Sequence, residues 1–262
     1  MLKIEVGDGR EPTREELLDA ALDSYGHFTA MQVREGHTRG LDLHLARLDA
    51  ANRELFGEEL DGELVRSRIR HALLDESPDA SVRVLVRGAG SGSASSGVRV
   101  FVTVRPPFTM PTDASQRLMS ARYQRTAPHI KRPGDFGQTY HLEQAQKAGY
   151  DDALLVADDG AIAEAAIANV AFFDGSSVIW PDAPVLAGIT MQVVAPRLAE
   201  YGIPSRTARV TLAEVGDFAG ACVTNSRGIA AVSAIDEVEL PIAAQFVKAM
   251  NAAYDAVPWE EI

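Results

Sequence analysis

The sequence has 262 residues, of which 46% are hydrophobic and 24% are charged, an ordinary composition for a soluble globular protein of one compact unit or two small domains. Its formal net charge of −12 makes nucleic acid and anionic membranes poor partners, so an anionic ligand would have to meet a local cluster of positive groups. No apolar stretch is long enough to span a membrane and the first residues contain no apolar signal core, so we expect a cytoplasmic protein.

The first half of the chain alternates predicted strands and helices. Thr13 and Glu16 form a capping-box pattern that opens a helix. Apolar residues at helical spacing predict a second helix over 41–55, which carries His44 and Arg47. The other predicted elements are strands at 3–6, 28–34, 81–87 and 98–105 and a helix at 63–74.

Two stretches of small, polar and proline residues interrupt this pattern. Residues 88–97, GAGSGSASSG, predict a flexible hairpin tip rather than a phosphate loop, because no Gly-Lys-Ser/Thr follows and the next element is a strand. A proline-containing stretch then indicates a linker, placed at 111–120. It would join an N-terminal domain of residues 1–110 to a mostly β C-terminal domain of residues 121–262.

Lys131 is notable because the chain has only four lysines. It follows a predicted short extended segment at 128–130 and precedes Pro133-Gly134, where a loop begins. A lysine held there and facing a cleft could lose its proton through desolvation and attack a carbonyl. The alternative is an exposed lysine at the end of a strand.

Glu164 is the only charged residue in a run of small apolar residues. This run is predicted to be the second strand of a hairpin, after an Asp-Gly turn. A carboxylate in such surroundings needs a cationic or hydrogen-bonding partner, or its pKa must rise. A pyridinium nitrogen would suit it, whereas on an exposed edge Glu164 would be a solvated side chain. The elements around it are a predicted helix at 138–148 and a strand at 153–157.

Two further segments carry groups that bind phosphate. Gly188-Ile189-Thr190 precedes a predicted helix over 191–201 and offers free amides, a hydroxyl and the helix dipole. Thr224-Asn225-Ser226 follows a predicted strand and could place Ser226 on the same phosphate. Taken alone, the first segment is better explained as an ordinary threonine N-cap, and a simple turn is the alternative for the second.

The single cysteine, Cys222, excludes an internal disulfide and predicts a buried strand thiol.

Taken together and in order, these pieces resemble the class IV aminotransferases, the pyridoxal-phosphate enzymes of fold type IV. That family includes branched-chain and D-amino acid aminotransferases, (R)-selective amine transaminases and aminodeoxychorismate lyase. The resemblance spans residues 28–236. It rests on His44-Leu45-Ala46-Arg47-Leu48, the Lys131 segment, Glu164 with Asn169, Leu186-Ala187-Gly188-Ile189-Thr190, and Thr224-Asn225-Ser226.

The resemblance implies an α+β or α/β protein with a smaller N-terminal α/β domain and a larger β-rich C-terminal domain. It implies that Lys131 carries pyridoxal 5′-phosphate as a Schiff base and that Glu164 keeps the ring nitrogen protonated. Tyr140 is the candidate hydrogen-bond partner of the ring hydroxyl, and His44 a structural hydrogen-bonding residue. The implied phosphate ligands are Arg47, Ile189, Thr190 and Ser226.

The chain departs from the family pattern at several positions. The aromatic residue expected two places after Asn169 comes one place later, at Phe172, and Met191 stands where a basic residue is usual. Trp180-Pro181 replaces Thr-Pro, and the early Phe-Glu pair reads Phe28-Thr29. These changes concern the substrate class more than the cofactor.

The resemblance implies an aminotransferase that moves an amino group between an amino acid or amine and a 2-oxo acid or ketone, in a homodimer. One alternative is aminodeoxychorismate lyase, which cleaves a β bond with the same cofactor to give 4-aminobenzoate and pyruvate. Another is a homologue that binds no cofactor and has a structural role. No metal-ligand spacing is evident, and neither substrate chirality nor the carboxylate-binding arginine, among Arg34, Arg105, Arg125 and Arg227, follows from the sequence.

Overall fold

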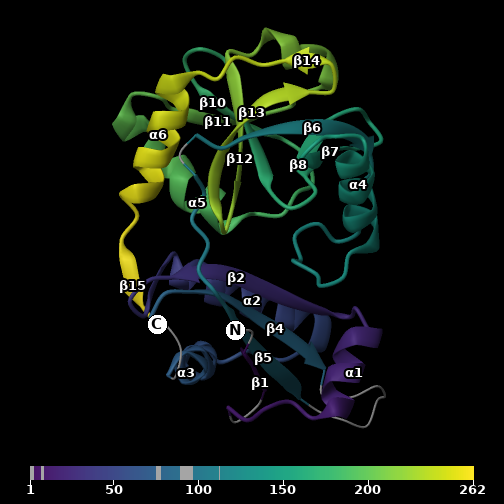
Figure 1. Ribbon diagram of the computed structural model, residues 1–262, viewed down its shortest axis with the longest axis vertical. Helices are drawn as coiled ribbons and strands as arrows, with labels where there is room; N and C mark the ends of the chain where they lie inside the picture. Colours follow the sequence, from purple (N-terminus) through teal and green to yellow (C-terminus); the bar gives the residue numbers. More distant parts are fainter. Residues whose placement is uncertain (1–2, 7–8, 75–77, 89–96, 112) are drawn as a thin grey trace. The chain divides into compact units, whose positions relative to one another are not determined.

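The computed structural model describes residues 3–6, 9–74, 78–88, 97–111 and 113–262 (Figure 1). Most of the hairpin tip predicted at 88–97 lies outside the described residues. The chain forms two compact units. Unit 1 contains Met1–Phe108, Ile130–Asp135 and Pro258–Ile262, and unit 2 contains Thr109–His129 and Phe136–Val257.

Unit 1 is built on a four-stranded antiparallel sheet with the strand order β1-β5-β4-β2. Two helices cover one face of the sheet and bury an apolar cluster against it. The alternating valines Val82, Val84 and Val86 of the central strand point into this cluster and are almost fully buried, as a period-2 pattern requires. The elements are β1 (Lys3–Val6), α1 (Arg14–Leu22), β2 (Gly26–Val33), α2 (Leu41–Phe56), α3 (Gly62–Leu73), β4 (Ala80–Gly88) and β5 (Val98–Arg105).

The last residues of the sequence also belong to unit 1. Strand β15 (Trp259–Glu261) pairs antiparallel with β3 (His37–Arg39). Helix α2 starts after Gly40, which has no side chain to cap it, and the Leu41 amide donates instead to Glu260 Oε2 at 2.8 Å. A residue more than two hundred positions away therefore supplies the N-terminal cap of α2.

Unit 2 is built on a nine-stranded mixed sheet with the order β11-β10-β9-β12-β13-β6-β7-β8, to which β14 adds beside β13. The sheet curls until its ends approach each other, because Ile162 N donates to Val210 O at 2.8 Å and Ala161 bridges to Thr211. The strands are β6 (Ser115–Arg122), β7 (Asp152–Val156), β8 (Ile162–Ala165), β9 (Asn169–Phe173), β10 (Val178–Pro181), β11 (Ser205–Ala208), β12 (Gly220–Asn225), β13 (Gly228–Ile235) and β14 (Val238–Glu239).

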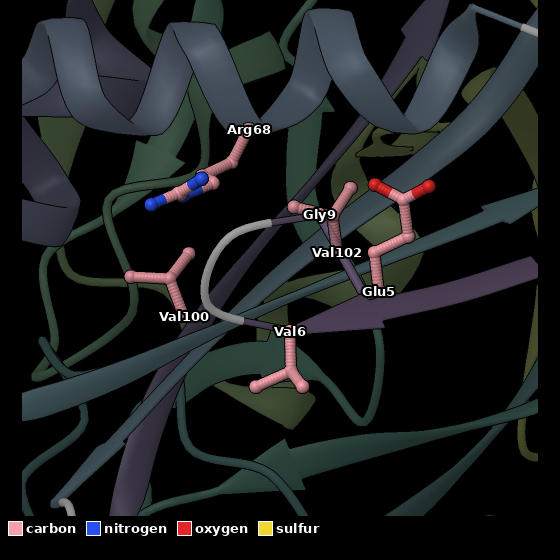
Figure 2. A pocket seen from close by; sticks show the side chains of 6 residues that line it. All are labelled: Glu5, Val6, Gly9, Arg68, Val100 and Val102. Carbon is pink, nitrogen blue, oxygen red and sulfur yellow. The ribbon is translucent and has the colours of Figure 1, made fainter. Parts of the chain in front are cut away.

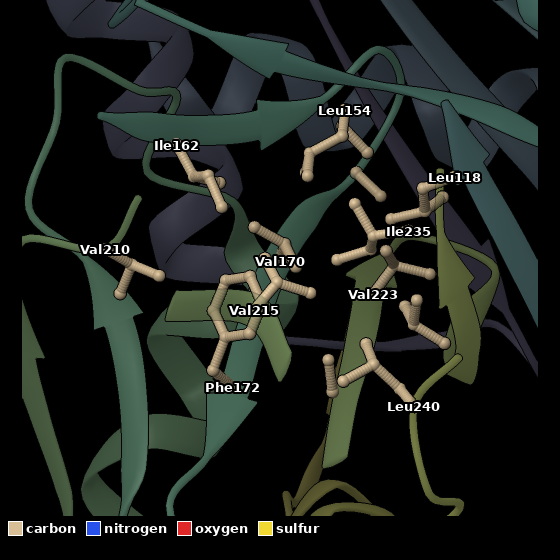
Figure 3. Packing of buried hydrophobic residues seen from close by; sticks show 14 of the residues in the cluster. Leu118, Leu154, Ile162, Val170, Phe172, Val210, Val215, Val223, Ile235 and Leu240 are labelled. Atoms are coloured by element: carbon tan, nitrogen blue, oxygen red, sulfur yellow. The ribbon is translucent and has the colours of Figure 1, made fainter. Parts of the chain in front are cut away.

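The inner face of this sheet forms the core of unit 2 (Figure 3). Phe172 on β9 is fully buried in it, with its ring 4.8 Å from that of Phe218. The next residue, Phe173, points to the opposite face and stacks on Phe246 at 5.1 Å. The aromatic residue that comes one place late in the sequence motif therefore fills the core. The helices of unit 2 are α4 (Phe136–Lys147), α5 (Ile189–Val194), η1 (Ala195–Tyr201), η2 (Leu212–Asp217) and α6 (Ala244–Asp255).

The structure corrects two of the predicted elements. Most of the linker placed at 111–120 is strand, because Ser115–Arg122 pairs with both β13 and β7 in the middle of the sheet. The helix predicted over 191–201 starts at Ile189 and changes to a 3-10 helix at Ala195, next to a proline that cannot donate to an α-helical hydrogen bond. No helix among the described residues is long and apolar enough to cross a membrane.

Candidate active site

Lys131 lies in an irregular segment of unit 1, so the prediction that it ends an extended strand was wrong. The chain turns before it, with a left-handed φ of 48° at Ala127. The Lys131 carbonyl accepts a hydrogen bond from the Phe28 amide at 2.8 Å, which fastens the segment to the start of β2. Its Nζ lies 5.0 Å from the centroid of the Phe28 ring, so the amine is held beside an aromatic face.

Arg47 and His44 are joined through the hydroxyl of Thr29, which is fully buried. The Arg47 guanidinium can only donate, so Thr29 Oγ1 accepts from it, and the same hydroxyl is hydrogen-bonded to His44 Nδ1 at 2.6 Å. Burial, aided by the positive charges of Arg47 and Lys131, lowers the pKa of His44 well below its usual value and so favours the neutral ring. The predicted role of His44 as a hydrogen-bonding residue is confirmed.

The buried guanidinium of Arg47 is suited to binding an anion. Burial lowers the pKa of its guanidinium to about 10, because a desolvated positive charge is costly. Its Nε is buried and has no hydrogen-bond partner among the described residues. A desolvated cation with an unused donor suits a phosphate group, which brings both negative charge and acceptor oxygens.

Glu164 lies on β8 of unit 2 and is only 4% exposed. Its Oε1 accepts from Arg125 Nη1 at 3.0 Å, and its Oε2 accepts from the Leu186 amide at 3.3 Å. Arg125, also buried, was one of four arginines considered for a substrate carboxylate, and the structure pairs it with Glu164 instead. A guanidinium and an amide favour the ionised form of a buried carboxylate, and that form can accept a hydrogen bond from a protonated ring nitrogen.

The two predicted phosphate segments lie together in unit 2. Thr190 Oγ1 donates to the Asn225 carbonyl at 2.8 Å, next to Ser226 in the turn between β12 and β13. Ile189 and Thr190 are buried and Ser226 is partly exposed. Thr224 Oγ1 is buried with no hydrogen-bond partner among the described residues, so this region also holds an unused polar group.

Tyr140 lies on α4 of unit 2 with 48% of its surface exposed. Its ring stacks on Phe136 at 5.9 Å and meets His141 edge to face at 5.3 Å. Neither ring contact is a hydrogen bond. The proposed hydrogen bond of Tyr140 to the ring hydroxyl of the cofactor stays a prediction.

The contacts of three side chains beside the predicted site residues were not predicted from the sequence. Thr29 joins Arg47 to His44, Arg125 holds Glu164, and Asn169 donates to the Leu186 carbonyl at 2.7 Å. The signal for Arg125 was present, because a buried glutamate needs a cationic partner. Its position 39 residues earlier in the chain gave no means of pairing the two.

One other hollow lies in unit 1, between β1 and α3 (Figure 2). It contains none of the predicted site residues. Its lining is Glu5, Val6, Gly9, Arg68, Val100 and Val102.

Solved structures show the same fold, that of the fold type IV transaminases. A hypothetical aminotransferase from Mycobacterium tuberculosis in its PLP-bound form has a TM-score of 0.78 at 21% identity, covering 96% of this chain and 98% of that one. The fold IV transaminase CpuTA1 from Curtobacterium pusillum has a TM-score of 0.77 at 22% identity, covering 87% and 83%.

The family model described as amino-transferase class IV matches residues 26–235, so the chain belongs to this family of pyridoxal-phosphate-dependent enzymes. A probable branched-chain-amino-acid aminotransferase of Rickettsia bellii (strain RML369-C) is 26% identical over 76% of this chain and 73% of its own. The aminodeoxychorismate lyase of Bacillus subtilis (strain 168) is 24% identical over 79% of both chains. A probable branched-chain enzyme of Rickettsia felis (strain ATCC VR-1525 / URRWXCal2) is 32% identical, but the match spans only 33% of its length.

The cofactor of the family is pyridoxal phosphate, and the side chains described above fit it. Arg47 offers an unused donor to an anion, Glu164 offers an ionised carboxylate, and Lys131 offers an amine. The phosphate of the cofactor requires a cationic donor, its ring nitrogen requires a hydrogen-bond acceptor, and its aldehyde requires an amine.

Proposed function

We propose that the protein is an aminotransferase that moves an amino group between an amino acid or amine and a 2-oxo acid or ketone. The observation that carries this proposal is the buried Glu164 carboxylate, held ionised by Arg125. When bound, pyridoxal phosphate supplies a ring that draws electrons from the substrate's Cα, and it does so best when its nitrogen is protonated. The match to a probable branched-chain aminotransferase supports the transfer reaction.

In this proposal each residue has a separate task. Lys131 would hold the cofactor's aldehyde carbon through Nζ, and as a free amine beside a bound substrate it would take the proton from the substrate's Cα. Glu164 holds the proton at the ring nitrogen. Tyr140 donates to the ring hydroxyl, and the phosphate is held by Arg47, Ile189, Thr190 and Ser226.

A second function, aminodeoxychorismate lyase, is supported by the match to the Bacillus subtilis enzyme along 79% of both chains. The same lysine and glutamate serve it, because removal of the Cα proton also precedes β-elimination. The two reactions differ in what happens to the amino group: a transaminase leaves it on the cofactor, whereas the lyase leaves it on the ring of 4-aminobenzoate and releases the side chain as pyruvate.

The test uses purified protein loaded with pyridoxal phosphate. With an amino donor alone, an aminotransferase converts the cofactor to pyridoxamine phosphate, whereas a lyase supplied with 4-amino-4-deoxychorismate forms 4-aminobenzoate and pyruvate without that conversion. Donors of both chiralities identify the substrate class. A protein that takes up no cofactor would contradict both functions and support a structural role.

A matched pair of lysine variants tests the assignment of Lys131. After reduction with borohydride, Lys131→Ala is expected to carry no covalent cofactor and to lose activity at least a thousandfold, on the order of the effect of removing a covalent catalyst. Lys147→Ala, which removes a lysine from the last turn of α4, should keep both. Covalent label on the Lys131→Ala protein would contradict the assignment.

A homodimer and a cytoplasmic location are also part of the proposal. Light scattering of the purified protein tests whether it is a dimer.

A further inference from the structure

The backbone of Leu186 in unit 2 is held at both its N–H and its carbonyl by buried polar side chains. Its N–H donates to Glu164 Oε2 at 3.3 Å, and its carbonyl accepts from Asn169 Nδ2 at 2.7 Å. Glu164 and Asn169 are 4% and 5% exposed. The backbone of one residue therefore connects the last part of β8, the first residue of β9 and the segment that leads into α5.

The Asn169 side chain reaches further along the same segment. A Cβ placed on Gly188 would lie 2.0 Å from Asn169 Oδ1, so the backbone at position 188 packs directly against this amide. Ile189 and Thr190 follow, and Thr190 is tied in turn to the Asn225 carbonyl. The Asn169 carboxamide thus contacts the segment at two points immediately before the proposed phosphate ligands.

We infer that Asn169 is a positioning residue: it sets the place of the Ile189–Thr190 turn relative to the Glu164 carboxylate, so that one connected frame holds both the ring nitrogen and the phosphate of pyridoxal phosphate. The inference rests on the proposed cofactor ligands and goes beyond them, because Asn169 is not one of those ligands and acts through the backbone at Leu186 and Gly188. A carboxamide suits the position, since its N–H donates to the Leu186 carbonyl and it adds no second negative charge beside Glu164.

Two contributions to the affinity for pyridoxal phosphate, that of its ring and that of its phosphate, therefore depend on the Asn169 side chain. A rigid ligand gains from contacts at both ends only when the protein holds those contacts at the matching separation. Without Asn169 the segment before Ile189 and Thr190 loses its contact with this carboxamide and is held less firmly relative to Glu164. The phosphate would then add less to the affinity of a ligand whose ring is already bound.

The experiment compares the dissociation constants of pyridoxal phosphate and of pyridoxal, which lacks the phosphate, for the protein freed of its cofactor. The ratio of the two constants measures the contribution of the phosphate. We expect Asn169→Ala to lower this ratio about tenfold, the effect of losing one buried hydrogen bond. Asn169→Asp has the same shape, keeps the packing and lacks the donor, so it should lower the ratio at least as much.

The matched control is Asn251→Ala, which removes an amide that donates to the Val247 carbonyl at 2.9 Å on α6. It is expected to leave the ratio unchanged, because α6 carries none of the proposed ligands. Ratios within twofold of the wild-type value in both Asn169 variants, or an equal fall in Asn251→Ala, would overturn the inference. Wild-type protein that binds neither compound would contradict the proposed function instead.

Discussion

Thr29 shows how much of a cofactor site can depend on one hydroxyl. It is fully buried, accepts from Arg47 and is hydrogen-bonded to His44 Nδ1, so one hydroxyl serves both side chains. The same residue occupies the place where the family pattern has glutamate. Threonine keeps Arg47 hydrogen-bonded without neutralising its charge, which leaves that charge available to a phosphate.

Replacing Thr29 by valine tests this arrangement. Valine has nearly the same shape but leaves Arg47 and His44 without their shared partner, so we expect a loss of about 1–3 kcal/mol in the free energy of unfolding. Thr29→Ser keeps the hydroxyl and is expected to lose less than half as much. Urea unfolding of the two variants beside the wild type makes the comparison, and equal losses would contradict a role for the hydroxyl.

At the scale of elements, the loop between β8 and β9 is hydrogen-bonded to the buried carboxylate of Asp152. Asp152, the first residue of β7, is 2% exposed and accepts from the Ala153 amide at 2.7 Å. The amides of Ala166 and Ile167, in the loop that joins Glu164 to Asn169, also face it. Burial nevertheless dominates and raises the pKa of Asp152 from 3.8 to about 6.

This shift predicts a pH dependence of stability. A pKa raised on folding means that the folded protein binds the proton more tightly, so the free energy of unfolding falls as the pH rises from about 4 to about 6. The full effect is about 3 kcal/mol for a shift of this size. Urea unfolding between pH 4 and 7 should show Asp152→Asn gaining stability relative to the wild type across that interval. The exposed Asp158→Asn is the control, and an Asp152→Asn curve parallel to the wild-type curve would disprove the assignment.

Elements that depend on local pattern were predictable from sequence, and those that depend on distant contacts were not. The Thr13–Glu16 capping box and the helix over 41–55 appear as expected, because their signals lie within a few residues. The linker predicted at 111–120 overlaps strand β6 because the partners of that strand, β13 and β7, lie far along the chain. The Lys131 segment is fastened by a backbone hydrogen bond from Phe28, which lies far earlier in the sequence.

The candidate site divides in the same way. The motifs identified Lys131, Glu164 and Thr190 because each has an unusual setting in the sequence. The partners Thr29 and Arg125 are common residue types, and only the folded chain places them beside Arg47 and Glu164.

At the scale of the whole molecule, unit 1 is completed by the last five residues of the sequence. Ile262 is buried in its core, and Glu260 caps the helix that carries Arg47. Glu260→Ala is expected to reduce the free energy of unfolding by about 1 kcal/mol, the usual cost of losing a helix cap. Glu261→Ala, on the same strand with an exposed side chain, should change it little. Chemical denaturation compares the pair, and equal effects would contradict the capping role.

This arrangement has a consequence for the order in which the chain can fold. Residues 109–257 of unit 2 lie between most of unit 1 and residues 258–262, so the cap of α2 and the pairing of β15 with β3 cannot form until unit 2 has been synthesised. Until then unit 1 lacks both its edge pairing and the carboxylate at the start of the helix that carries Arg47.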